Sequence, residues 1–137
     1  MGDTILRVDY FTTTVADKPG EGLRLLNRLK EAGVSLLGFS AFPVPDGQAQ
    51  LDFLPSDTEQ FLKAAAGAGI PLSEKKRGFL IEGVDRPGAV AEVVRCLADA
   101  RINITAMDAL CTGGGRYGAI LWVKPAAYES AAKALGV

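Results

Sequence analysis

Two copies of an Asp-x-Pro-Gly motif, at residues 17–20 and 85–88, are the groups in this chain best suited by type and spacing to bind a small molecule. A carboxylate can accept a hydrogen bond from an ammonium group, and a glycine lets a ligand approach the backbone because it has no Cβ. A helix that begins after each motif would add free N–H groups and a partial positive charge, which attract a carboxylate. The motif therefore predicts a site for a small zwitterion. The alternative is that the aspartate only caps the helix and the glycine only permits the bend.

The two motifs belong to an internal repeat. A shift of 68 residues aligns them, and the same shift, without a gap, also aligns Leu29 with Leu97 and Ala41 with Ala109. A single register held over this length indicates a duplication. We expect one repeat over residues 1–76 and a second over residues 77–137.

Each repeat predicts the same elements. A β-rich run is followed by the motif, by an amphipathic helix and by two strands joined at a glycine-containing turn, and then by a second helix. In the first repeat Leu23, Leu26 and Leu29 recur at helical spacing, which predicts a buried stripe. Gly33 stands where that helix should end with a positive φ, and Arg101 holds the equivalent place in the second repeat. The expected strands are 8–15, 34–44 and 48–54, then 78–84, 102–112 and 116–123.

The last strand of the pattern is present only once. Residues 70–76 predict it in the first repeat, whereas the second repeat reaches Val137 at the position that aligns with Gly69. Residues 2–8 precede the first motif as residues 70–76 precede the second, so we expect the amino-terminal segment to supply the missing strand. The order βαββαβ predicts an α+β, ferredoxin-like fold, in which helices cover one face of each antiparallel sheet.

The motif at 85–88, followed by residues 93–104, resembles the signature of the ACT domain family, and residues 17–20 and 29–36 resemble it as well. The resemblance covers nearly the whole chain as a tandem pair. It implies the βαββαβ fold, paired domains, and binding of an amino acid or related metabolite at a domain interface. It also implies regulation of a metabolic enzyme and no catalytic residue of its own. We expect a homodimer, because the sheet face that the helices do not cover must be buried.

The resemblance also implies ligand-binding residues. In the second repeat they are Asp85, Arg86, Gly88, Ala89, Asn103 and Ile104, and in the first they are Asp17, Lys18, Gly20 and Ser35. The amide of Asn103 can donate to a carboxylate and accept from an ammonium group, whereas the hydroxyl of Ser35 is shorter. We therefore expect the second repeat to hold the better site. Alternatively, Asn103 bonds only to its own backbone at the start of a strand.

Several function classes find little support in the composition. The formal net charge is −1 and the chain has no histidine, so the commonest general base and metal ligand is missing. We expect no metal, no cofactor and no nucleic-acid partner, since basic residues are scattered. Neither a signal peptide nor an apolar run of about 20 residues is present, which favours a cytoplasmic protein outside the membrane. The two cysteines, Cys96 and Cys111, read as reduced apolar residues.

Two other functions stay open at the level of sequence. One is an assembly module that pairs its sheet edges with a protein partner and binds no small ligand. The other is an acylphosphatase-like hydrolase that uses Arg86 and Asn103, although many unrelated functions share a ferredoxin-like architecture.

Overall fold

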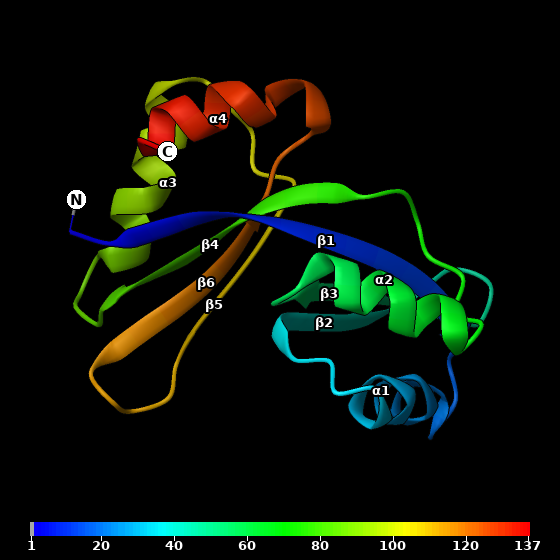
Figure 1. The fold of residues 1–137 in the computed structure, drawn as a ribbon. Helices are drawn as coiled ribbons and strands as arrows, with labels where there is room; N and C mark the ends of the chain where they lie inside the picture. Colours follow the sequence, from blue (N-terminus) through cyan, green and yellow to red (C-terminus); the bar gives the residue numbers. More distant parts are fainter. Residues whose placement is uncertain (1) are drawn as a thin grey trace. The chain divides into compact units, whose positions relative to one another are not determined.

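The computed structural model describes residues 2–137, which form two compact units. One unit comprises Asp9–Lys76, and the other combines the residues up to Val8 with Arg77–Val137. The described residues form six strands and four helices, which confirms the expected α+β, ferredoxin-like class (Figure 1). None of these helices is long and apolar enough to cross a membrane.

The unit of residues 9–76 places two helices on a sheet with strand order β2-β3-β1. Its apolar core joins the sheet to both helices through the residues Phe11, Leu25, Leu29, Leu51, Phe53, Phe61 and Ala65. Its elements are β1 (Thr4–Ala16), α1 (Glu21–Glu31), β2 (Leu36–Val44), β3 (Gln48–Pro55) and α2 (Thr58–Gly67). The carboxylate of Asp57 caps α2 by accepting from the backbone N–H of Gln60 at 3.0 Å.

The other unit has the strand order β1-β4-β6-β5, to which β1 contributes its first residues. Its helices pack on one face of the sheet (Figure 1), in a core of Ile5, Phe79, Ile81, Val93, Leu97, Leu121 and Ala132 with their neighbours. Its further elements are β4 (Lys76–Val84), α3 (Ala89–Asp99), β5 (Ala106–Cys111), β6 (Arg116–Trp122), the short 3₁₀ turn η1 (Pro125–Ala127) and α4 (Tyr128–Leu135).

Backbone hydrogen bonds repeat at the 68-residue interval predicted by the sequence. The N–H of Asp17 donates to Gly47 at 2.9 Å, and the N–H of Asp85 donates to Gly115 at 2.9 Å. The same holds at the helix ends, where Val34 donates to Leu29 and Ile102 to Leu97. The duplicated sequence thus builds duplicated local structure.

Both first helices begin at the glycine of the motif. Gly20 and Gly88 are the N-cap residues of α1 and α3, with φ of 91° and 83°, and neither helix receives a side-chain cap hydrogen bond. The alternative that aspartate caps the helix is therefore wrong for both motifs. The helices start two residues after Pro19 and Pro87, because glycine alone tolerates this left-handed φ without strain.

The buried stripe of α1 differs from the predicted one. Leu25 and Leu29 are buried, whereas Leu23 is 60% exposed. The buried pair lies four residues apart and matches Val93 and Leu97 of α3 at the 68-residue interval. Leu23 shares the sequence spacing but faces solvent, since a leucine-rich helix offers more apolar positions than one face can bury.

The strand expected over residues 70–76 begins only at Lys76. The stretch before it still runs along β1, where the N–H of Ser73 donates to the carbonyl of Thr12 at 2.8 Å. The N–H of Thr12 donates instead to the side-chain Oγ of Ser73 at 2.9 Å. Pro71 has no N–H to donate, and this interrupts a regular ladder.

The ends of α1 and α3 agree with the sequence prediction. Gly33 has a φ of 75°, and Arg101, at the equivalent place, has a φ of 59°. A residue with a Cβ is strained in this region, so Arg101 carries a backbone cost that Gly33 avoids.

Candidate functional site

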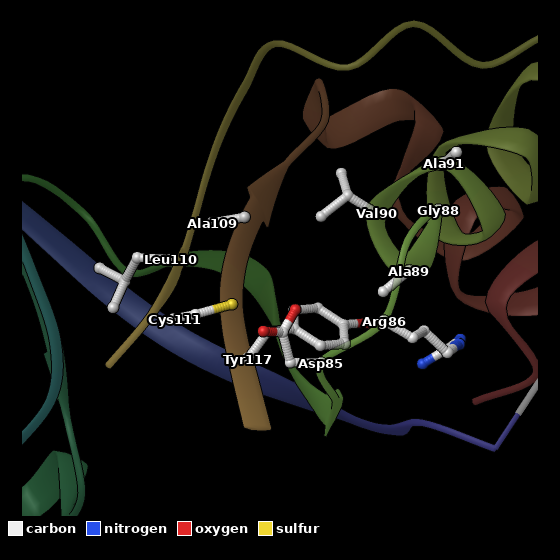
Figure 2. A pocket seen from close by; sticks show the side chains of 10 residues that line it. All are labelled: Asp85, Arg86, Gly88, Ala89, Val90, Ala91, Ala109, Leu110, Cys111 and Tyr117. Atoms are coloured by element: carbon white, nitrogen blue, oxygen red, sulfur yellow. The ribbon is translucent and has the colours of Figure 1, made fainter. Parts of the chain in front are cut away.

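A pocket of about 240 Å³ lies where β4 leads into α3 (Figure 2). We call it the loop pocket. It is lined by Asp85, Arg86, Gly88, Ala89, Val90, Ala91, Ala109, Leu110, Cys111 and Tyr117. The structure thus brings together four predicted residues, Asp85, Arg86, Gly88 and Ala89, around one hollow. Its volume is below the range of about 300–1,000 Å³ that is common for drug-sized ligands, so it suits a small molecule.

One wall of the loop pocket is formed by the two strands at the edge of the sheet. Cys111 of β5 pairs with Tyr117 of β6, and Ala109 pairs with Ala119 two positions along. Side chains at these alternate positions point to the same face of the sheet. The small side chain of Ala109, which lines the pocket at this face, leaves part of the space that the pocket occupies.

The other wall is the turn into α3. The φ of Gly88 is 83°, and a Cβ at this residue would meet no atom within 4 Å. The backbone here is therefore uncrowded, and glycine is required by conformation rather than by crowding. The N–H of Ala89 donates to the backbone carbonyl of Arg86 at 3.2 Å, which closes the turn.

The buried carboxylate of Asp3 binds the loop between β4 and α3. The side chain of Asp3 is 1% exposed, accepts from the phenol of Tyr117 at 2.7 Å and from Arg86 Nη1 at 3.2 Å. The same Nη1 donates to the carbonyl of Val84 at 2.9 Å, and Arg86 Nη2 donates to Glu92 at 2.6 Å. We call Asp3, Arg86, Glu92 and Tyr117 the anchor network. Charge-assisted bonds of this kind are about twice as strong as neutral ones.

The anchor network shifts the pKa of its members. Burial alone raises the pKa of Asp3, but the hydrogen bonds from Tyr117 and Arg86 and the positive charge of Arg86 outweigh it, so the pKa of Asp3 is lowered overall. Burial, and then the hydrogen bond to Asp3 and its negative charge, raise the pKa of Tyr117 to about 12. Asp3 is therefore ionised and Tyr117 protonated at neutral pH.

Asp85 contributes a negative charge to the lining of the loop pocket. Its side chain is exposed and forms no ion pair within residues 2–137. It accepts a hydrogen bond from the thiol of Cys111, and this bond is the largest cause that raises the pKa of Cys111. Figure 2 shows the Asp85 and Cys111 side chains turned toward each other, whereas the guanidinium of Arg86 points away from them.

Asn103 and Ile104 lie in a different hollow. Together with Val94, Ala98, Arg101 and Ile102 they line a pocket of about 520 Å³ at the carboxyl end of α3, which we call the helix-end pocket. Helix α3 has 11 residues and spans about 16 Å at 1.5 Å per residue. A single small ligand cannot touch Asn103 and Gly88 of the same chain, so the structure does not bring these two predicted residues together.

The predicted residues of the first repeat lie in the other unit. Asp17, Lys18, Gly20 and Ser35 are all exposed. Ser35 uses its carbonyl to accept two bonds from Ser56, at 3.1 Å from the N–H and 3.0 Å from the hydroxyl. These contacts fix the start of β2. They involve the backbone carbonyl of Ser35 and not its hydroxyl.

The anchor network has no equivalent in the first repeat. At the 68-residue interval, Asp3, Arg86, Glu92 and Tyr117 correspond to Pro71, Lys18, Arg24 and Ala49. A Cβ on Gly83 would collide with the Asp3 carboxylate, and the residue that corresponds to Gly83 is Val15. The two loops therefore share a backbone and differ in what holds them.

Sequence reasoning missed Asp3, Glu92, Tyr117 and Cys111. Asp3 is separated from its partners by more than 80 residues of sequence, and none of the four belongs to a motif. The signal that could have found them is the difference between the repeats at aligned positions. Across residues 2–137 there is no group of three or more His, Cys, Asp or Glu side chains that could hold a metal ion.

Comparison with solved structures places the fold. Protein BT0572 from Bacteroides thetaiotaomicron superposes with a TM-score of 0.81 at 15% identity, over 96% of this chain and 88% of that one. The regulatory subunit of aspartate kinase from Thermus thermophilus gives 0.64 at 18% identity, over 98% and 95%. The regulatory subunit of aspartate kinase from Thermus flavus gives 0.66 at 19% identity, over 98% and 95%.

No family model matches the chain, and no curated protein matches it. At these identities the structural matches show a shared fold alone. Two of the similar chains are regulatory subunits of an enzyme rather than catalytic ones.

Proposed function

We propose that this chain is a regulatory protein with tandem ACT-type units that senses a small amino acid or related metabolite and modulates a metabolic enzyme. The observation that carries the proposal is the loop pocket, in which four residues predicted from the sequence surround one small hollow beside a helix start. The likeness to regulatory subunits of aspartate kinase supports a regulatory role over a catalytic one.

The chemistry of the loop pocket suits a zwitterion. The carboxylate of Asp85 can accept from an ammonium group, while the uncapped first turn of α3 presents backbone N–H groups to a carboxylate. Three alanines, Val90 and Leu110 supply aliphatic side chains to the lining. The first repeat has the same backbone turn without the anchor network, so we propose that the second unit binds first.

The separation of Asn103 from the loop pocket bears on assembly. Within one chain, α3 keeps the helix-end pocket and the loop pocket about 16 Å apart. In a homodimer, the helix-end pocket of one copy can face the loop pocket of the other and complete a shared site. We propose this arrangement for the homodimer. Within each chain, we propose that the amino-terminal segment supplies the last strand of the second repeat.

The hydrolase alternative fits this geometry less well. It needs Arg86 and Asn103 at one substrate, yet they line different pockets, and Arg86 is engaged by Asp3 and Glu92. The assembly alternative remains the competing outcome of the binding test. In that reading the outer edge of β5 pairs with a partner and no small ligand binds.

Thermal unfolding in the presence of each of the twenty amino acids tests the proposal. A site with a Kd of about 0.1 mM adds about 2.7 kcal/mol to the free energy of unfolding at about 10 mM ligand. We expect this stabilisation from one or a few amino acids with small side chains. Failure of all twenty to stabilise the protein would favour the assembly module.

A further inference from the structure

The anchor network determines which charges a ligand meets in the loop pocket. Arg86 lies two residues before Gly88, the N-cap of α3, and its guanidinium forms ion pairs with Asp3 at 3.2 Å and with Glu92 at 2.6 Å. Its side chain is 30% exposed and points away from Ala109 and Cys111 (Figure 2). Asp85, in contrast, faces the pocket and accepts a hydrogen bond from the thiol of Cys111.

Several contacts within the unit fix the position of the Asp3 side chain. Its carboxylate is almost fully buried, it holds both Arg86 and Tyr117, and it occupies the space that a Cβ on Gly83 would take. Truncating one member of a buried charge pair leaves the other without compensation, so such a pair is maintained as a set. Each member is replaced in the first repeat, where Val15 fills the place of Gly83.

We propose that Asp3 is a positioning residue that sets the charge selectivity of the loop pocket. By pairing with the guanidinium of Arg86, which points away from Asp85, it leaves the negative charge of Asp85 without a cation beside it, so the pocket takes an amino acid with a small uncharged side chain and rejects an acidic one. A second carboxylate on the ligand would face Asp85 without a cation to balance it, and this repulsion is the basis of the rejection. The inference rests on the proposed function and adds the ligand class to it.

Alanine and aspartate are the matched probes, because they differ only by the side-chain carboxylate. Calorimetric titration of the unaltered protein should show alanine binding at least tenfold more tightly than aspartate. In the variant Asp3→Asn, Arg86 loses a charged partner and can turn into the pocket. The ratio of the two affinities should then fall by a factor of about ten, mainly because aspartate binds better.

Two further variants and one control distinguish the release of Arg86 from a loss of folding. The double variant Asp3→Asn, Arg86→Gln should recover the preference for alanine, because the cation that would attract aspartate is gone. Glu92→Gln disturbs Arg86 through its exposed partner and should shift the ratio in the same direction even if Asp3→Asn is unstable. Asp99→Asn removes an equal charge from the exposed far end of α3 and should leave the ratio unchanged.

The outcomes distinguish this inference from the proposed function. If the unaltered protein binds no amino acid, the proposed function fails and the selectivity with it. If alanine binds but aspartate binds equally well, or if Asp3→Asn and Glu92→Gln both leave the ratio unchanged, only the role of Asp3 is overturned.

Discussion

The phenol of Tyr117 donates a hydrogen bond of 2.7 Å to the carboxylate of Asp3, which lies 114 residues earlier in the chain. This contact joins the amino-terminal segment to β6, directly beneath the turn into α3. Arg86 completes the junction from the turn itself, at 3.2 Å from the same carboxylate. The loop pocket is thus supported by a side chain that no local motif contains.

Replacing Tyr117 with Phe should change stability most clearly in alkali. The raised pKa of Tyr117, about 12, favours the protonated folded state, so its stabilising effect is present below pH 10 and is lost as the pH rises from about 10 to about 12. At neutral pH, loss of a hydrogen bond to a charged group should cost about 1.5–3 kcal/mol. Urea unfolding of both proteins from pH 7 to 12 measures the difference, which should shrink as the pH rises. A difference that stays constant over this range would contradict the assignment.

Replacing Gly88 with Ala should remove ligand binding at a modest cost in stability. The left-handed φ of 83° makes the substitution cost about 1–2 kcal/mol, although a Cβ there meets no atom within 4 Å. Gly136→Ala is the matched control, because Gly136 has a φ of 82°, equally open space and a place at the end of α4. Both variants should melt at similar temperatures, and only Gly136→Ala should keep the stabilisation by an amino acid. If an amino acid stabilised both variants equally, the start of α3 would not be part of the binding site.

Replacing Gly83 with Ala should disrupt the anchor network. The new methyl group would collide with the Asp3 carboxylate and lie 3.0 Å from Tyr117 Cε1, and such overpacking costs about 1–3 kcal/mol. Gly118→Ala, on the neighbouring strand β6, meets its nearest atom only at 3.9 Å and should cost less. The decisive measurement is the double variant Gly83→Ala, Asp3→Ala. Its loss of free energy of unfolding should be smaller than the sum of the two single losses, because the collision is gone.

Replacing Arg101 with Gly should stabilise the protein. Arg101 holds a φ of 59° at the place where the first repeat has Gly33, and relief of this strain should add about 0.5–1 kcal/mol to the free energy of unfolding. Gly33→Arg is the mirror-image change and should destabilise by a similar or larger amount. Thermal melts of the two variants should move in opposite directions. Movement in the same direction would show that side-chain contacts, not backbone strain, dominate at these ends.

Local signals explain which parts of the fold were predictable. The turn with Asp46 and Gly47, both at a φ of 69°, the cap of α2 at Asp57 and the end of α1 at Gly33 all depend on residues close in sequence. The strand over residues 70–76 failed because Pro71 breaks a ladder that its neighbours favour. In α1 the spacing of leucines did not reveal that Leu23 faces solvent, since that depends on what the helix packs against.

The candidate site was predictable only in its backbone. Asp85 to Ala89 could be placed together because the motif is contiguous. Asn103 could not be excluded from the same hollow until the length of α3 was known. Asp3 and Tyr117 act through contacts between distant parts of the chain, and only their mismatch with Pro71 and Ala49 in the aligned repeat hints at them.

The division of β1 between the two units has a consequence for how the chain is made. Ile5 belongs to a core whose other members all come from residue 79 onward. A ribosome adds about 5–20 residues per second, so this part of the strand waits for a few to about fifteen seconds before its partner β4 is synthesised. The first part of β1 is therefore made well before its native contacts can form, while residues 9–76 can already fold around the second half of the same strand.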